Sequence, residues 1–570
     1  MGAFRDALKP VSSEGVQRWC YVHPDQLNLD VGPWRPTPER PRSSIGLILI
    51  ETAWKAKQRP YHQQKLALVL TNLRHFALEA QEAGHPVMML HDDRPYEAVL
   101  AAQADVLGPI HAMRWAERET RLALEPLEAQ GVLIVKEHTG WLTNRALFDR
   151  AVGKKRPWRM DSFYREARKA HGILVTEDGK PIGGKWSLDA ENRLPWDGSV
   201  PLPVVPTFPP DAITQEVVET VEALYGDHPG RVTPHDLPAS AMDAERAWRW
   251  ALDEAMPYFG PYEDAMTVQH RSLFHTRIAT LLNLGRLQAG RVVHDVEQAD
   301  LALNSKEGFI RQVLGWREFI RHVHDATEGL TEHVHVGMST TSRPAGGWPG
   351  AWPDAPPTVN ALADDVPLPQ AYWGAKSGLA CLDDVTQAVL EDGWTHHIPR
   401  LMVLANLGTL IGIRPRELTD WFWAMFTDAY DWVVEPNVLA MGTYATGPLM
   451  STKPYVCGTP YLKRMGDACK DCAFSPSSTC PISDMYWAFL ARHAPMFEGN
   501  FRMAMPLRTL AKRSPEKREA DARVHATVVD VLSQARALTP QDIKQARALP
   551  PQDIKQARVG GLATEPSPAQ

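Results

Sequence analysis

Four of the six cysteines have a spacing that could bind one metal centre. Cys469 and Cys472 form a C-x-x-C pair, Cys480 follows after a further seven residues, and Cys381 lies far upstream. A C-x-x-C pair places two sulfur atoms within reach of one metal, and four thiolates suit either a structural zinc ion or an iron–sulfur cluster. Spacing alone leaves both metals open, together with unmetallated thiols, and does not decide between Cys381 and Cys457 as the fourth ligand.

Two neighbouring histidines, His396 and His397, are candidates for acid–base chemistry. Histidine suits proton transfer near neutral pH because its unperturbed pKa lies at about 6.5. Neighbouring residues of a helix point about 100° apart, so we expect only one of the two to face a substrate directly. The alternative that these residues leave open is hydrogen bonding of one or both inside the core.

The elements that must position these residues divide the chain into two kinds of structure. Residues 17–140 alternate apolar stretches, at 45–50 and 87–90, with an amphipathic stretch at 63–83. This pattern predicts an α/β domain with a parallel, Rossmann-like sheet. No G-x-G-x-x-G follows the first predicted strand, so no dinucleotide site is expected there.

The remainder of the chain reads as a large all-α domain. We predict an interdomain connection over 141–211, with a proline-rich part at 183–210 that suits neither a regular helix nor a central strand. Residues 212–510 show helical spacing, for example at 388–411 and 417–425, interrupted by a loop at 342–357. Residues 511–570 hold the repeat ARALTPQDIKQ–ARALPPQDIKQ, and we expect this polar tail to be disordered.

Composition limits the classes of partner and compartment. The 570 residues carry 61 Lys and Arg against 68 Asp and Glu, a net charge of −7. A protein that coats nucleic acid through overall positive charge is therefore excluded, and DNA contact would need local basic segments such as 154–159 or 512–518. No apolar run approaches the roughly 20 residues that span a bilayer, so we expect no membrane contact and a cytoplasmic location.

Several motifs, in their order and spacing, resemble one protein family. The chain is similar over residues 17–510 to the photolyase/cryptochrome superfamily, in its bacterial iron–sulfur branch, which is related to the bacterial (6-4) photolyases. The motifs that carry this resemblance are DQL at 25–27, RMDSFYR at 159–165, GGKWSLDAENR at 183–193, HTRIAT at 275–280, QVLGWREF at 312–319, HHIPRLM at 396–402, PN at 436–437 and TKPY at 452–455.

The resemblance implies three cofactors and their ligands. It implies a [4Fe-4S] cluster on Cys381, Cys469, Cys472 and Cys480, which leaves Cys457 spare. It implies FAD in the helical domain, bound by His275, Thr276, Arg277, Ile278, Ala279, Gln312, Arg317, Glu318 and Asn406. It also implies a 6,7-dimethyl-8-ribityllumazine antenna in the first domain, near Asp25, Glu51 and Lys65.

The same resemblance implies a reaction. A monomeric lyase would repair (6-4) photoproducts in UV-damaged DNA by light-driven electron transfer from reduced FAD, with His397 as the essential acid–base residue and His396 supporting it. Trp373, Trp421 and Trp423 would pass electrons to the flavin. Two alternatives stay open: a blue-light photoreceptor without repair activity, and a zinc-bearing nucleic-acid-binding protein without flavin. The family carries an acid two residues after Trp432, where this chain has valine.

Overall fold

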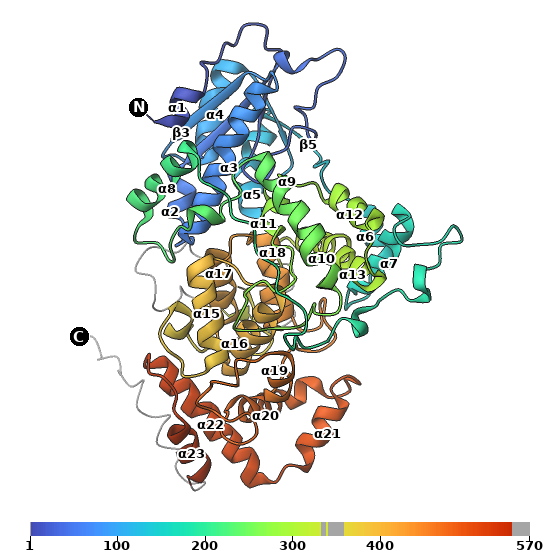
Figure 1. The fold of residues 1–570 in the computed structure, drawn as a ribbon, viewed down its shortest axis with the longest axis vertical. Coiled ribbons are helices and arrows are strands. Elements are labelled where there is room, and N and C mark those ends of the chain that lie inside the picture. The colour runs from blue at the N-terminus through green and yellow to red at the C-terminus, as the bar shows by residue number, and fades with distance from the viewer. Residues whose placement is uncertain (1, 332–337, 340–357, 550–570) are drawn as a thin grey trace, which may run out of the picture.

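The first domain is built on a parallel sheet of five strands. A computed structural model describes residues 2–331, 338–339 and 358–549 (Figure 1). The strands run in the order β3-β2-β1-β4-β5 and pair in parallel throughout. Their bounds are β1 Arg18–Tyr21, β2 Ile45–Thr52, β3 Val87–Asp92, β4 Ile110–Met113 and β5 Leu133–Lys136. The predicted Rossmann-like sheet is therefore confirmed.

Helices bury both faces of this sheet. On one face, Leu47 and Leu49 of β2 pack with Phe76 of α3 (Gln63–Glu82). On the other face, the alternate residues Ile48 and Ile50 pack in a core that also contains residues of α4 (Tyr96–Leu107) and α5 (Arg118–Ala129). Successive side chains of a strand point to opposite faces, so a run apolar at every position is what a doubly covered sheet requires. The predicted helix at 63–83 differs from α3 by one residue.

The stretch predicted as an interdomain connection contains two helices. α6 (Arg145–Val152) and α7 (Met160–His171) bury Phe148 and Phe163 against Phe319 of α14, so they belong to the helical domain's own core. The prediction of a connection over all of 141–211 is therefore wrong for these helices. Between 185 and 210, the structure has one short 3-10 turn, Asp189–Glu191, as the prolines there indicate.

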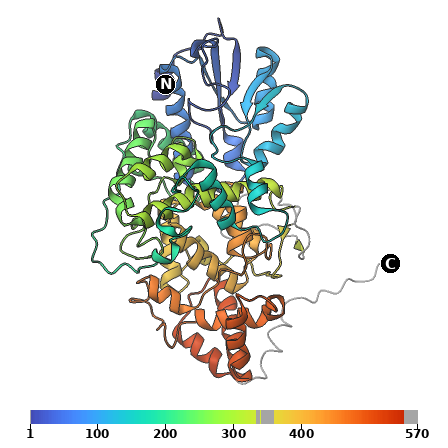
Figure 2. The same cartoon turned by 90° about the vertical axis from the view of Figure 1, so that its right-hand side faces the viewer.

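The described residues from 251 onward form mostly helices joined by loops and lie below the sheet in Figures 1 and 2. No helix in the described ranges is both long enough and apolar enough to span a membrane. The loop predicted at 342–357 falls outside the described residues. The helices are α1 Ala3–Ala7, α2 Ala53–Lys57, α8 Ala212–Tyr225, α9 Ala241–Trp250, α10 Met256–Phe259, α11 Ala279–Asn283, α12 Ala289–Gln298, α13 Leu303–Ile310, α14 Glu318–Ala326, α15 Ala380–Asp392, α16 Asn406–Ile411, α17 Pro415–Met425, α18 Asp431–Val434, α19 Thr459–Met465, α20 Ile482–His493, α21 Ala504–Lys512, α22 Pro515–Ser533 and α23 Pro540–Ala548.

One predicted helical stretch is broken where the histidine pair lies. The apolar spacing over 388–411 spans the end of α15, a turn, a π-helical segment at Pro399–Ala405, and α16. α15 ends at Gly393, whose φ of 61° lies in the left-handed region that favours glycine. His396 precedes the next helix and His397 opens it, so the two side chains are not neighbours within one helix.

The C-terminal part is ordered further than its composition suggests. α22 and α23 extend the helical domain to Leu549, so the prediction of disorder over 511–570 is wrong for these residues. Val524, Val528 and Val531 of α22 recur at helical spacing and are buried. This apolar stripe faces α20 and outweighs the polar composition of the remaining surface. The second copy of the repeat lies mostly outside the described residues.

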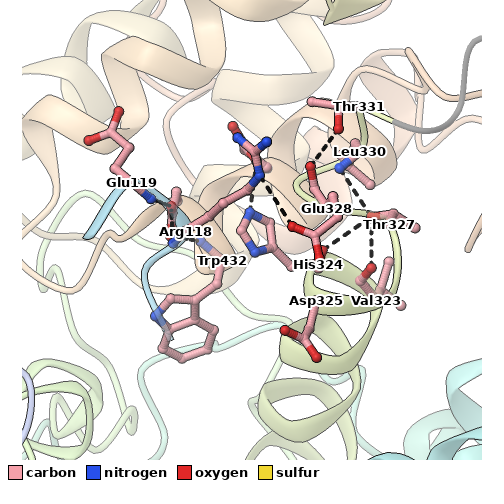
Figure 3. A network of polar contacts seen from close by, with 12 residues as sticks. Arg118, Glu119, Val323, His324, Asp325, Thr327, Glu328, Leu330, Thr331 and Trp432 are labelled. Carbon is pink, nitrogen blue, oxygen red and sulfur yellow. Dashed lines mark hydrogen bonds and ion pairs between the residues drawn. The ribbon is translucent and has the colours of Figure 1, made fainter. Parts of the chain in front are cut away.

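Buried polar contacts join the two domains (Figure 3). At the start of α5, the Asp431 carboxylate accepts backbone N–H groups of Arg118 at 2.6 Å and Glu119 at 3.2 Å. Close by, the ring of His324 lies 2.8 Å from the Glu435 carboxylate, which also pairs with Arg416 at 2.7 Å. A carboxylate at a helix N-terminus satisfies otherwise unpaired N–H groups, so these contacts fix the sheet domain against α14 and α18.

The pair of His324 and Glu435 makes a pH-dependent contribution to stability. Burial by itself would lower the pKa of His324, but Glu435 and the nearby Asp431 together hold it above its usual range. The contribution is thus complete below about pH 6.5, the unfolded value, and is lost as the pH rises through the higher folded pKa. We expect His324→Gln to lower the free energy of unfolding by about 1.5–3 kcal/mol at pH 6 and by less at pH 9. Urea unfolding at both pH values measures this, with the exposed His294→Gln as control; equal losses would contradict it.

Candidate functional site

Three histidines from separate segments form one cluster. The rings of His275 and His396 stack with centroids 4.1 Å apart, and the ring of His397 lies 5.2 Å from His275 and 6.1 Å from His396. Ring nitrogens of all three lie within 4.8 Å of one another. In the sequence, His275 belongs to a different motif from the histidine pair. The sequence therefore does not predict that His275 belongs to this cluster, and the structure shows that it does.

All three histidines are neutral at pH 7. Burial, followed by the positive charge of Arg400, lowers the pKa of His397 to about 4, and burial holds the pKa values of His275 and His396 well below the usual range. Within the described residues, the buried His275 Nε2 and His396 Nδ1 atoms have no hydrogen-bond partner. A buried polar atom without a partner is costly, so these atoms are available to a bound molecule.

An ion pair that the sequence analysis missed holds the turn beneath the cluster. Arg400 donates two parallel bonds to Asp428, with Nη1–Oδ1 at 2.9 Å and Nη2–Oδ2 at 3.0 Å. Its Nε donates to the carbonyl oxygen of Thr395 at 2.7 Å, so the guanidinium also pins the residue before His396. Arg400 and Asp428 lie 28 residues apart in the chain, so no local sequence pattern predicts that they form an ion pair. Bidentate geometry of this kind gives orientation as well as energy.

Residues of the HTRIAT segment line one side of a small cavity that has both apolar and polar walls. Thr276 and Arg277 line a cavity of about 70 Å³ together with Trp394 and Thr427. Arg277 has a φ of 56°, and its guanidinium lies 4.8 Å over the Trp394 ring. Within the described chain Arg277 makes no ion pair, although burial lowers its pKa. Asp236 and Asp392 line the same cavity and act on this pKa, but neither forms an ion pair with the half-buried Arg277, so its guanidinium keeps donors for an anionic ligand such as a diphosphate. Ile278 is buried and Ala279 begins α11.

Gln312 reaches the histidine cluster through a buried acid. Its Nε2 donates to Glu263 Oε1 at 2.7 Å, and Asn192 donates to the other oxygen at 2.8 Å. Burial raises the pKa of Glu263 to about 7, and the backbone carbonyl of the same residue accepts a hydrogen bond from the His275 ring. The segment 183–193 is therefore tied to the cluster through Asn192.

The structure places the remaining residues of the QVLGWREF motif elsewhere. Glu318 is fully buried and accepts the backbone N–H of Thr143 at 2.9 Å and its hydroxyl at 2.7 Å. The Arg317 guanidinium lies 4.1 Å over Trp141 and 5.5 Å from the Trp432 ring. Their contacts thus lie at the junction with the sheet domain and not among the three histidines.

The four cysteines predicted as ligands come together. Burial, followed by repulsion from the thiols of Cys480, Cys469 and Cys472, raises the pKa of Cys381. Such repulsion arises between the ionised forms of thiols that lie near one another. Four neighbouring thiols form a donor set suited to a thiolate-bound metal centre. Cys457 stands apart from them: its N–H donates to Asn406 Oδ1 at 2.9 Å, and Asn406 Nδ2 lies 3.4 Å from its sulfur. Asn406, predicted to bind FAD, thus anchors the spare cysteine.

The three tryptophans belong to the same hydrophobic core. Trp421 is fully buried and its Nε1 donates to the carbonyl oxygen of Tyr372 at 3.1 Å, next to Trp373 in the chain. The Trp373 Nε1 is buried and has no partner among the described residues. Trp423 differs, because the Arg59 guanidinium lies 3.7 Å from its ring and it faces the space between the domains.

That space is a cavity of about 700 Å³ between the sheet and α17. Glu51 and Lys65, two of the three residues predicted near an antenna, line it with Trp423 and Tyr430. Lys65 donates to the carbonyl oxygens of Trp423 at 2.8 Å and Ala429 at 2.7 Å, and burial lowers its pKa to about 7. Asp25 lies outside the cavity wall but holds His23, which lines it, at 2.7 Å.

Comparison with known proteins places the chain. Residues 20–237 match the family model described as "Deoxyribodipyrimidine photo-lyase-related protein". A (6-4) photolyase of Agrobacterium fabrum is 31% identical over 500 residues, which is 84% of this chain and 93% of that protein. Two solved structures share the fold at 12% identity and a TM-score of 0.52: a bacterial class III photolyase from Agrobacterium tumefaciens, which aligns over 94% of this chain and 99% of its own, and the cryptochrome of Synechocystis sp. PCC6803, over 90% and 99%. On its fold and on its identity to a relative of nearly equal extent, the chain belongs to the photolyase/cryptochrome superfamily.

Proposed function

We propose that this protein is a lyase that repairs (6-4) pyrimidine photoproducts in UV-damaged DNA, driven by blue light. The observation that carries the proposal is the cluster of two buried histidines and the half-buried His397, held by the Arg400–Asp428 pair next to the cavity that Arg277 lines. The (6-4) photolyase from Agrobacterium fabrum, identical at 31% of aligned positions, supports it.

Arg277, Thr276 and the start of α11 would hold the diphosphate of FAD. Arg277 forms no ion pair among the described residues, although Asp236 and Asp392 line the same cavity, and its guanidinium could therefore bind an anion there. Reduced FAD, when bound and excited, supplies an electron to a nearby acceptor. Asn406, Gln312, Arg317 and Glu318 would act by fixing the walls of the helical domain around it, as their protein contacts indicate.

The histidines would move the proton that the repair requires. Reversal of the lesion transfers a proton between its two pyrimidine halves, and His397 is the member of the cluster that is only half-buried. At neutral pH its ring carries one N–H to donate and one bare nitrogen to accept. Burial, and after it the positive charge of Arg400, lowers the pKa of the ring and so keeps it uncharged at neutral pH. His396 and His275, stacked behind it, would orient the ring.

Cys381, Cys469, Cys472 and Cys480 would hold a [4Fe-4S] cluster. Their mutual charge interaction supports one shared centre, and the buried surroundings of Cys381 and Cys480 suit a thiolate-bound iron cluster shielded from solvent. Trp373, Trp421 and Trp423 would pass electrons towards the flavin, and all three lie in the same core as Cys381.

The interdomain cavity would bind the lumazine antenna. Its volume of about 700 Å³ and its mixture of apolar wall with Glu51 and Lys65 fit a small polar heterocycle. Filling it with Ala53→Trp is expected to weaken lumazine binding about 5- to 150-fold, since overpacking of a filled site costs about 1–3 kcal/mol. Fluorescence titration with lumazine measures this, with Ala129→Trp on the exposed face of α5 as control. Equal affinity in both variants would contradict an antenna at this cavity.

The test of the whole proposal is repair of a defined lesion. The reduced, flavin-loaded protein is illuminated with blue light in the presence of an oligonucleotide that carries a single (6-4) photoproduct, and restored thymines are counted by chromatography. Light-dependent repair is expected, with no repair in the dark. Flavin-bound protein that leaves the lesion intact would favour the photoreceptor alternative.

A further inference from the structure

The first copy of the C-terminal repeat and the first four residues of the second contact the segments that carry two of the proposed cluster ligands. Residues 535–549, which include α23, pack beside α22 at the end of the molecule far from the sheet (Figure 1). Ile543 and Ala546 of this segment are buried in the same core as Leu382 and Met485. We name residues 535–549 the C-terminal clasp.

One end of the clasp holds the turn that precedes Cys381. Leu538 is buried and its N–H donates to the carbonyl oxygen of Ser377 at 2.8 Å. Ser377 in turn caps the start of α15 through Asp383, with Oγ–Oδ1 at 2.6 Å. The approach is close enough to require glycine at 378, where an added Cβ would lie 2.2 Å from the Leu538 carbonyl oxygen. The clasp thus contacts the turn from which the helix of Cys381 starts.

The other end of the clasp holds the segment of Cys480. The Arg547 guanidinium pairs with Asp484, with Nη2–Oδ2 at 2.6 Å, and also donates to the carbonyl oxygens of Cys480 at 3.3 Å and of Ser478. One side chain therefore bonds to the backbone of a proposed ligand and to the first turn of α20 behind it. Arg523 of α22 donates to the carbonyl oxygen of Ala546 at 3.0 Å, which fixes the end of α23 itself.

We propose that the C-terminal clasp locks the proposed cluster by joining its upstream and downstream ligand segments, with Arg547 as a positioning residue. The inference rests on the proposed cluster. Cys381 and Cys480 come from segments about a hundred residues apart in the chain, so release of iron requires these segments to separate or the loop at Cys480 to open. Each contact of the clasp opposes that opening. The repeat therefore serves cluster retention in this chain.

The repeat supplies its own matched control. Arg536 occupies the same position in the first copy that Arg547 occupies in the second, but it is exposed and pairs with Asp542 within the clasp at 3.1 Å. Substitution of either arginine removes the same charge. Only Arg547 touches a ligand segment.

The experiment measures loss of iron from the full-length holoprotein in excess chelator, followed by visible absorbance and iron quantitation. Arg547→Ala is expected to lose iron about tenfold faster than the wild type, as expected for loss of charge-assisted hydrogen bonds, while Arg536→Ala stays within about twofold. Equal rates in all three proteins would overturn the clasp alone. A wild-type protein that never contains iron would overturn the cluster proposal and the clasp with it.

Hydrogen exchange of the unmodified holoprotein tests the same inference without a variant that could misfold. The amides of 377–383 and of 538–549 are expected to exchange together, with closely similar protection, because the clasp and the upstream segment open as one unit. Protection lost from 538–549 at least about a hundredfold sooner than from 377–383 would overturn the proposal, since the clasp would then open on its own.

Discussion

Replacement of His397 by alanine is expected to reduce light-driven repair of the (6-4) photoproduct by at least about a hundredfold, the typical contribution of a positioned proton donor or acceptor. The half-buried ring of His397 lies at the open side of the three-histidine cluster, so its loss removes the proton carrier without disturbing the Arg400–Asp428 pair. Flavin content and iron content are expected to stay at wild-type levels, because His397 contacts neither Arg277 nor the cysteines among the described contacts.

Three measurements on the same preparations make this result decisive: repair per photon, bound flavin and bound iron. His294→Ala, an exposed histidine on α12, is the matched control and should repair normally. His396→Ala is expected to reduce repair less, because His396 is buried behind the cluster and acts by orienting its neighbour. Normal repair by the His397 variant would contradict the acid–base assignment while leaving the family membership untouched.

Local hydrophobic patterns in the sequence predict the strands and helices whose burial follows directly from those patterns. Doubly buried strands such as β2 read as continuous apolar runs, and the amphipathic stretch of α3 was predicted within one residue of its end. The four cysteines were predicted as one set from the family resemblance, and the thiols of that set do lie close to one another.

Contacts between distant segments could not be predicted in this way. His275 joins the pair of His396 and His397, and Arg400 binds Asp428, only because the segments that carry them pack together. The order of the C-terminal clasp was missed for the same reason: its polar composition reads as disorder, whereas its few apolar residues, such as Ile543, find a core that other segments build. Gly393, which separates α15 from the histidines, was a visible helix stop within an otherwise helical pattern.

The second large effect concerns the cysteines, where Cys472→Ala is expected to lose essentially all bound iron. A cluster with three remaining thiolates has one iron without a protein ligand, and the metal-free segment 469–480 contains little regular structure to replace what the cluster holds together. Much of the protein is therefore expected to become insoluble on expression. Iron and sulfide quantitation, together with the visible spectrum of the soluble fraction, measure the result.

Cys457→Ala is the matched control, since Cys457 is also half-buried in the same core but is held by Asn406 and not by the other thiols. We expect this variant to keep its full iron content, because the alanine N–H can still donate to Asn406 Oδ1. Retention of iron by Cys472→Ala and its loss from Cys457→Ala would reassign the fourth ligand. Loss of iron from both variants would instead show that this core does not tolerate truncation of a cysteine. Melting temperatures separate the two cases: removal of an iron ligand destabilises only the iron-bound form, whereas a damaged core also destabilises the metal-free protein.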